Sequence, residues 1–251
     1  MSVPVTSHLE RLPLDSLFNT RDLGGIPIAN GGFTAFGRFL RSDETAKLSD
    51  ADLARLIDYP VKLVIDLRTP SEIRQLPSRL AHVDGIRYEN ISLMGDDLDE
   101  GIAAIEINMP GRVESTLGDF YIHMLKHFGH EIGRVFSIMA EQQDGAMLFH
   151  CAHGKDRTGL IAALLLKLAG ASDADIIENY AISYHLLLPW FETFWDHVPD
   201  RVKPFLNTDR EHMEETLAFF NSHYDSVSQY LTIHNVSEQT VERVRQMMIG
   251  A

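Results

Sequence analysis

One short segment of the chain gathers the residue types that can do chemistry: His150-Cys151-Ala152-His153-Gly154-Lys155-Asp156-Arg157-Thr158-Gly159. Its cysteine is the only one among 251 residues, and the arginine follows after five intervening residues. The apolar run AMLFH precedes the cysteine, and the apolar segment TGLIAALLLKLAG follows the arginine. The pattern therefore predicts a turn that leads from a buried strand into a helix, with the cysteine at its start.

Such a turn can hold a nucleophile inside an anion-binding cradle. A helix N-terminus and neighbouring cations stabilise a thiolate, which is the reactive form of Cys151. Successive backbone N–H groups of the loop would form a concave anion site, and the planar fork of Arg157 matches two phosphate oxygens. We expect Cys151, Asp156 and Arg157 to be catalytic and predict attack on phosphorus. The residues expected to bind substrate are Ala152, His153, Gly154, Lys155 and Thr158.

The elements around this loop indicate an α/β fold. Residues 61–67 and 146–150 are continuous apolar runs typical of buried parallel strands, and residues 36–42 and 86–93 also read as strands. Between them, residues 48–59 form a predicted helix capped by Ser49, and residues 69–72 carry a capping-box pattern. This alternation predicts a central, mostly parallel sheet flanked by helices, followed by a helical part beyond residue 172.

The same loop resembles the HCxxGKDRTG signature of the bacterial atypical tyrosine and lipid phosphatases. Further similarity lies in Asn19-Thr20-Arg21-Asp22-Leu23-Gly24-Gly25, in Leu40-Arg41-Ser42, in Ile65-Asp66-Leu67-Arg68 and in the C-terminal segment VSEQTVERVRQMM. The resemblance covers most of the chain and is strongest in residues 19–74 and 146–184. It implies a cysteine phosphatase fold that acts on phosphotyrosine, with phosphoserine, phosphothreonine and phosphoinositides as wider substrates. In that family Lys155 would attract a phosphorylated headgroup, whereas His153 departs from the usual alanine.

Two carboxylates compete for the role of general acid. Asp156 lies in the loop and could protonate the leaving oxygen and then activate water, although capping of the next helix is a second reading. Asp119 lies upstream, where dual-specificity phosphatases place their acid, and we favour Asp156 over it. Asp196, in the string FWDHVP, follows the nucleophile, so we interpret this string as aromatic packing.

Charged pairs elsewhere are better explained as structural. Asp66 and Arg68 close a predicted central strand, and we expect an ion pair that orients the loop; Arg21 and Asp22 receive the same interpretation. Residues 95–115 have weak periodicity and lie where the family carries a helical lid. A lid insertion around residues 95–125 or a solvated surface excursion fits them equally.

Two other classes of function also fit part of this pattern. A rhodanese-like sulfurtransferase also puts a cysteine on an anion-binding loop, and a non-catalytic phosphate-binding module would keep the cradle without turnover. A buried inert cysteine does not account for the glycine, arginine and threonine at these spacings. A closed zinc site would need a fourth ligand beyond His150, Cys151 and His153, so we expect no metal and no cofactor.

Composition sets the remaining limits. Lys and Arg number 22 and Asp and Glu number 36, which gives 22 − 36 = −14 and argues against nucleic acid as a partner. One cysteine cannot form an internal disulfide, and the N-terminus lacks a secretory pattern. The longest apolar stretch is interrupted by Lys167 and is too short to span a bilayer. We expect a single phosphatase domain over residues 1–251, located in the cytoplasm, with no stable membrane insertion and with a phosphorylated protein or phosphoinositide as substrate.

Overall fold

The computed structural model describes residues 9–96, 116–198 and 203–250. Within these residues, the strands form one five-stranded sheet in the order β1-β2-β5-β3-β4. The pair β1–β2 is antiparallel, whereas the pairs β2–β5, β5–β3 and β3–β4 are parallel, which confirms the prediction of a mostly parallel sheet. The strands are β1 Arg21–Asp22, β2 Phe39–Ser42, β3 Val61–Asp66, β4 Arg87–Asn90 and β5 Ala146–His150.

The register of the three middle strands brings their carboxyl ends to one level. Ser42 of β2 pairs with His150 of β5, and His150 pairs in turn with Asp66 of β3. In open α/β sheets, ligands bind at this edge, beyond the carboxyl ends of the strands. The cysteine-containing loop therefore leaves the sheet between two strand ends that can support it.

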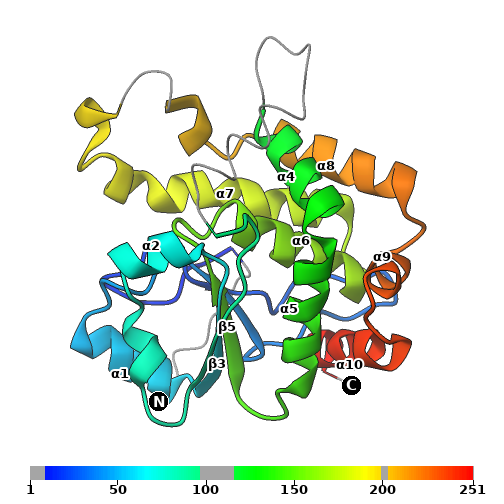
Figure 1. The fold of residues 1–251 in the computed structure, drawn as a ribbon, viewed down its shortest axis with the longest axis horizontal. Coiled ribbons are helices and arrows are strands. Elements are labelled where there is room, and N and C mark those ends of the chain that lie inside the picture. Colours follow the sequence, from blue (N-terminus) through cyan, green and yellow to red (C-terminus); the bar gives the residue numbers. More distant parts are fainter. Residues whose placement is uncertain (1–8, 97–115, 199–202, 251) are drawn as a thin grey trace.

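Side chains of β5 alternate between two hydrophobic cores on the two faces of the sheet. Ala146 and Leu148 lie in the smaller core, which helix α1 (Asp50–Asp58) covers, whereas Met147 and Phe149 lie in the larger one. Helices α5 (Gly129–Glu141) and α6 (Arg157–Ala169) belong to the larger core. Figure 1 shows α1 and α5 on opposite sides of the strands. All five β5 side chains are buried, which explains the apolar character of residues 146–149.

The expected caps are present at the helix ends. Ser49 accepts a hydrogen bond from the Asp52 N–H at the start of α1, and Thr69 and Glu72 form a capping box at α2 (Pro70–Gln75). Helix α6 ends at Gly170, which adopts the left-handed conformation that closes many helices. The predicted caps and the predicted helix end are thus confirmed. They could be predicted because each depends on residues within one turn of helix.

The part beyond residue 172 is helical, as predicted. The string FWDHVP contributes aromatic packing around Phe191 and Leu206, and Asp196 is exposed. No described helix is long and apolar enough to cross a membrane. The remaining helices are η1 Arg79–His82, α4 Leu117–His127, α7 Asp173–Phe191, η2 Trp195–His197, η3 Lys203–Leu206, α8 Arg210–His223, α9 Val227–Ile233 and α10 Glu238–Ile249.

The segment 95–125, for which a lid insertion was considered, falls largely outside the described residues. Residues 97–115 are not described, and the segment continues as helix α4. Tyr121, Met124 and Leu125 of α4 lie in the larger core, and α4 contacts α8. This described portion is therefore a core helix.

Candidate active site

The loop that joins β5 to α6, residues 151–156, is held by donors from the N-terminal third of the chain. The backbone N–H of Glu44 and the side chains of Asn19 and Arg41 donate to the carbonyl oxygens of loop residues 152, 153 and 154, over 3.0, 2.9 and 2.7 Å. No described residue accepts a hydrogen bond from the loop N–H groups of residues 152–155. Because the loop carbonyl oxygens are bonded to these donors, the loop N–H groups are available to bind an anion.

Gly154 allows the loop to lie directly against the end of β2. Its φ is +68°, a conformation that L side chains rarely adopt. A Cβ added there would lie 2.4 Å from the carbonyl oxygen of Ser42 and 2.7 Å from the N–H nitrogen of Asp43, both backbone atoms. The loop could not keep this position with another residue at 154.

Cys151 follows the last residue of β5 directly and is 1% exposed. The Nδ1 atom of His150 lies 3.0 Å from the Cys151 carbonyl oxygen, which can only accept, so Nδ1 carries a proton. The Nε2 atom lies 3.5 Å from a carboxylate oxygen of Asp66. Asp66 accepts three hydrogen bonds from the Arg68 side chain, of 2.7 to 3.1 Å. The pair Asp66–Arg68 thus lies behind the histidine that contacts the loop, where the sequence led us to expect an orienting ion pair.

Arg157 occupies the first position of α6 and forms a bidentate ion pair with Glu72. Its two terminal nitrogens donate to the two carboxylate oxygens over 2.6 and 2.8 Å. Burial lowers the pKa of Arg157, but its hydrogen bonds to Glu72 and the neighbouring negative charges outweigh burial and raise this pKa above its ordinary value. A guanidinium has five N–H donors, and two are used here, so three remain for phosphate oxygens. Glu72 therefore fixes the plane of the fork without exhausting it.

Asp156 lies at the end of the loop and is contacted from two sides. Its Oδ1 accepts a hydrogen bond from the Tyr121 hydroxyl over 2.7 Å and from the Lys155 ammonium over 2.9 Å. Burial raises the pKa of Asp156, yet the Lys155 charge and these hydrogen bonds outweigh it and hold the pKa below its ordinary value. Asp156 also precedes α6, but its side chain makes no capping hydrogen bond.

The two other polar loop residues, Lys155 and His153, are engaged by contacts within the protein. Lys155 is 1% exposed, and its ammonium also donates to the carbonyl oxygens of Phe205 and Asn207, over 2.8 and 3.4 Å. The His153 ring packs 5.0 Å from the Trp190 ring, centroid to centroid. Burial, followed by the charge of Lys155, lowers the pKa of His153 to about 4. Lys155 thus ties the loop to the 205–207 segment.

Two buried arginines lie beneath the loop. Arg21 and Arg41 are both 0% exposed and both donate to the Asn179 carbonyl oxygen, over 2.8 and 3.2 Å. Burial lowers the pKa of Arg41 to about 10, and the negative charge of a Cys151 thiolate acts in the opposite direction. Asp22 accepts hydrogen bonds from the N–H groups of Gly24 and Gly37 and from the Tyr59 hydroxyl, so it joins separate segments of the chain. The expected pair of Asp22 with Arg21 does not form among the described residues, because Arg21 donates to Asn19, Asn179 and Ser183.

The remaining predicted residues differ in where the structure places them. The Thr158 hydroxyl is buried in the first turn of α6 and has no hydrogen-bond partner among the described residues. Asp119, the rival acid, accepts a hydrogen bond from the Thr116 N–H over 3.1 Å and completes the capping box of α4. The described residues contain no group of three or more His, Cys, Asp or Glu side chains arranged to hold a metal ion.

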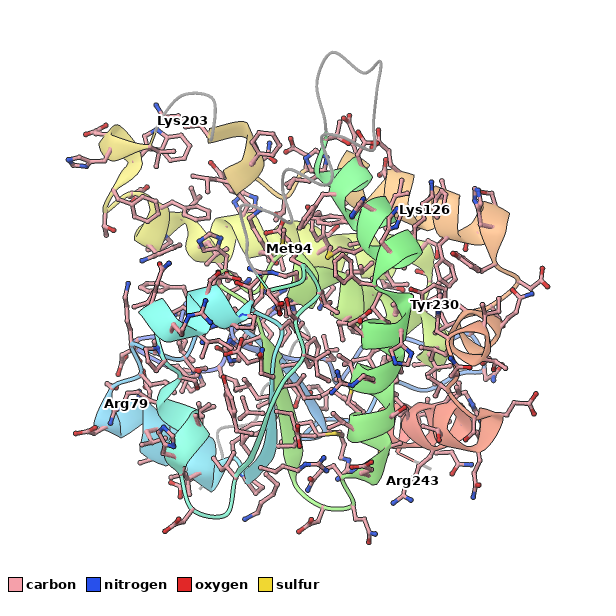
Figure 2. All side chains as sticks on the ribbon, in the orientation of Figure 1. Arg79, Met94, Lys126, Lys203, Tyr230 and Arg243 are labelled. Carbon is pink, nitrogen blue, oxygen red and sulfur yellow. The ribbon has the colours of Figure 1, made fainter. Side chains whose placement is uncertain are left out.

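Two cavities differ in their relation to the loop. One of about 80 Å³ lies beside it, with Ala152, His153, Phe18, Lys47 and Trp190 in its lining. A larger one, of about 490 Å³, is lined by Phe36, Arg38, Arg243 and their neighbours, and Arg243 lies on α10 at the lower end of the view in Figure 2. The larger cavity contains no residue of the loop, so volume alone does not mark the reactive site.

Sequence reasoning missed two residues of this site. Glu72 was recognised only as a capping residue, and Tyr121 was not singled out. Their partners Arg157 and Asp156 lie 85 and 35 residues away along the chain. A tyrosine hydroxyl next to a candidate acid in LGDFY was the one available signal.

Comparison with known proteins places this geometry in context. The model of the tyrosine phosphatase family matches residues 12–250. A tyrosine-protein phosphatase of Nostoc commune is 38% identical over 218 residues, which cover 82% of this chain and 72% of the relative. A protein of Cupriavidus necator, named as a candidate tyrosine-protein phosphatase, is 31% identical over 231 residues, covering 88% and 82%. The triple specificity protein phosphatase PtpB of Mycobacterium tuberculosis is 27% identical over 265 residues, covering 85% and 91%.

Proposed function

The chain belongs to the tyrosine phosphatase family, and from this premise we propose that it hydrolyses phosphotyrosine through a phosphocysteine intermediate formed on Cys151. The single observation that supports this assignment is the loop itself. A cysteine at the end of a central strand, a set of uncommitted loop N–H groups and an arginine oriented by Glu72 converge on one anion site.

In the first step the Cys151 thiolate attacks phosphorus while the bond to the tyrosine oxygen breaks. The loop N–H groups and Arg157 bind the three equatorial oxygens, where charge is spread in the transition state. Asp156 gives a proton to the leaving oxygen, so that neutral tyrosine departs. A dianionic phosphate in the cradle raises the pKa of this carboxyl, because like charges oppose ionisation.

In the second step water attacks the phosphocysteine and the P–S bond breaks. Asp156, now ionised, accepts the proton of the water, and the thiolate and inorganic phosphate are released. Thr158, in the first turn of α6, is our candidate to donate to the departing sulfur, since its buried hydroxyl has no partner among the described residues.

The test is release of phosphate from a phosphotyrosine peptide by the wild type and by Cys151→Ser. We expect the serine variant to lose turnover by at least a thousandfold while it still binds the peptide, because the cradle remains and only the thiolate is lost. Turnover within tenfold of the wild type would contradict the mechanism. Asp156→Asn and Asp119→Asn, measured side by side, assign the acid: loss confined to Asp156→Asn supports the assignment, and loss confined to Asp119→Asn overturns it.

The proposal extends to a wider substrate range and a location. One relative is named a triple specificity phosphatase, so a panel of phosphoserine, phosphothreonine and phosphoinositide substrates belongs beside the tyrosine peptide. The placement of Lys155 supports no selective headgroup contact, since its ammonium already has three protein acceptors.

We propose the cytoplasm as the location, because a reducing compartment keeps a nucleophilic thiol available. Thiocyanate formation, the sulfurtransferase reaction, serves as the negative control.

A further inference from the structure

We propose that Tyr121 and Lys155 are positioning residues for Asp156, which clamp one carboxylate oxygen and thereby direct the other toward the leaving group. The inference rests on the proposed function, since it assumes that Asp156 is the general acid. It assigns to Lys155 a partner within the protein in place of a substrate headgroup.

The two hydrogen bonds converge on the same atom. Tyr121 and Lys155 both donate to Oδ1, over 2.7 and 2.9 Å, and no described residue donates to Oδ2. A carboxylate with one oxygen engaged twice has a defined rotation about its last bond and a defined free oxygen. Oδ2 is therefore the atom that carries the transferred proton.

The Lys155 ammonium is held in one position by its hydrogen bonds. An ammonium has three N–H donors, and those of Lys155 have three acceptors: Asp156 and the carbonyl oxygens of Phe205 and Asn207. The side chain is 1% exposed. These contacts fix the cation between the loop and the segment before α8, so it acts on Asp156 from a fixed point.

Tyr121 is fixed as well. It is 0% exposed, its hydroxyl lies 2.7 Å from that of Tyr180, and the two rings meet edge to face with centroids 5.7 Å apart. Because a carboxylate only accepts, the Tyr121 hydroxyl donates to Asp156 and accepts from Tyr180. The direction of both bonds polarises the Tyr121 O–H toward the carboxylate.

The sign of the pH effect follows from the groups around Asp156. Both donors favour the ionised carboxylate, so removing either raises the pKa of Asp156 and keeps the acid protonated to higher pH. The other titratable groups that act on it are unchanged by these substitutions: His153 of the loop, Arg157 of α6, Arg41 of β2, Tyr180 of α7 and His212 of α8.

The experiment is the pH profile of kcat/KM for wild type, Asp156→Asn, Tyr121→Phe and Lys155→Met. The profile of Asp156→Asn first identifies the basic limb that belongs to Asp156. We expect that limb to move up by about one pH unit in Tyr121→Phe, because this substitution removes one charge-assisted hydrogen bond to the carboxylate. In Lys155→Met we expect the limb to move in the same direction. We also expect kcat to fall about tenfold for phenyl phosphate and less than threefold for p-nitrophenyl phosphate, whose leaving group hardly needs an acid.

Tyr180→Phe is the matched control. It removes the same kind of hydroxyl, one hydrogen bond further from Asp156, and leaves the Tyr121–Asp156 hydrogen bond in place. A limb that moves by less than half as much in Tyr180→Phe as in Tyr121→Phe supports the clamp. An unmoved or lowered limb in Tyr121→Phe overturns it, and so does an equal shift in Tyr180→Phe. If Tyr121→Phe does not fold, the same criteria apply to Lys155→Met. If the wild type releases no phosphate, the proposed function itself is wrong. If the basic limb is still present in Asp156→Asn, Asp156 is not the general acid.

Discussion

At the scale of single residues, Glu72 uses one carboxylate for two purposes. Its Oε2 accepts hydrogen bonds from the Thr69 N–H and hydroxyl, which begin α2, and from Arg157, while its Oε1 accepts from Arg157 alone. The pKa of Glu72 lies below its ordinary value, because the Arg157 hydrogen bonds and charge outweigh burial. A helix cap and the orientation of Arg157, the arginine proposed to bind phosphate, are therefore joined in one side chain.

Replacing Glu72 should separate these purposes. In Glu72→Gln the amide can still cap α2, but the charge and one acceptor for Arg157 are lost. Because a hydrogen bond to a charged group is worth about 1.5–3 kcal/mol, we expect kcat/KM for a phosphotyrosine peptide to fall by about ten- to a hundredfold. The loss of kcat/KM should appear mainly as a higher KM, since the proposed contact of Arg157 with phosphate would already exist in the ground state.

Thr69→Ala is the matched control, because it removes the cap and leaves both carboxylate oxygens for Arg157. We expect its free energy of unfolding to fall by about 1 kcal/mol, with kcat/KM within about threefold of the wild type. An equal loss of activity in the two variants would mean that α2 itself, and not the ion pair, supports the site.

At the scale of elements, the site depends on how closely the loop before α6 approaches β2. Gly154→Ala would place a Cβ against two backbone atoms and would force a left-handed alanine. We expect the free energy of unfolding to fall by about 2–5 kcal/mol, from backbone strain and overpacking. A loop displaced by about 1 Å should also lower kcat about a hundredfold. Chemical denaturation and steady-state kinetics measure the two effects.

Gly31→Ala provides the comparison for this change. Gly31 also has a positive φ, of +80°, but a Cβ there meets nothing within 4 Å. We expect it to lose only the cost of a left-handed alanine, about 1–2 kcal/mol, and to keep its activity. If both variants keep kcat, the contact between the loop and β2 does not matter for catalysis.

The difference between what the sequence predicted and what it missed also lies at this scale. The strands at 61–66 and 146–150, the caps at Ser49 and Thr69, and the loop before α6 were predictable, since each depends on neighbours along the chain. The bonds between Glu72 and Arg157 and between Tyr121 and Asp156 join separate elements. They exist only once the sheet has brought those elements together, and no local pattern encodes them.

At the scale of the whole molecule, the loop adds a pH dependence to stability through His153. Burial lowers the pKa of this histidine to about 4, whereas an unfolded chain has a histidine pKa near 6.5. The unfolded state therefore binds more protons between these values. The stabilising contribution is fully present above pH 6.5 and is lost as the pH falls toward 4.

The expected size follows from proton linkage. Between pH 7 and pH 5 the free energy of unfolding should fall by up to about 2 kcal/mol through His153 alone. His153→Ala should remove this part of the slope while it lowers stability by a constant amount, because the contacts with Trp190 and Phe191 are lost at every pH. The measurement is urea denaturation of both proteins at pH 5, 6 and 7.

Comparing slopes, and not absolute values, isolates the histidine from groups of opposite sign. Burial raises the pKa of Asp43 to about 6, so its folded form takes up a proton as the pH falls and gains stability over part of the same range. That gain is present in the wild type and in His153→Ala and cancels in their difference. His185→Ala, at an exposed position of α7, is the control for loss of a histidine as such. If His153→Ala kept the wild-type slope and His185→Ala flattened it, the acid sensitivity would come from the surface of α7 and not from the buried ring beside the catalytic loop.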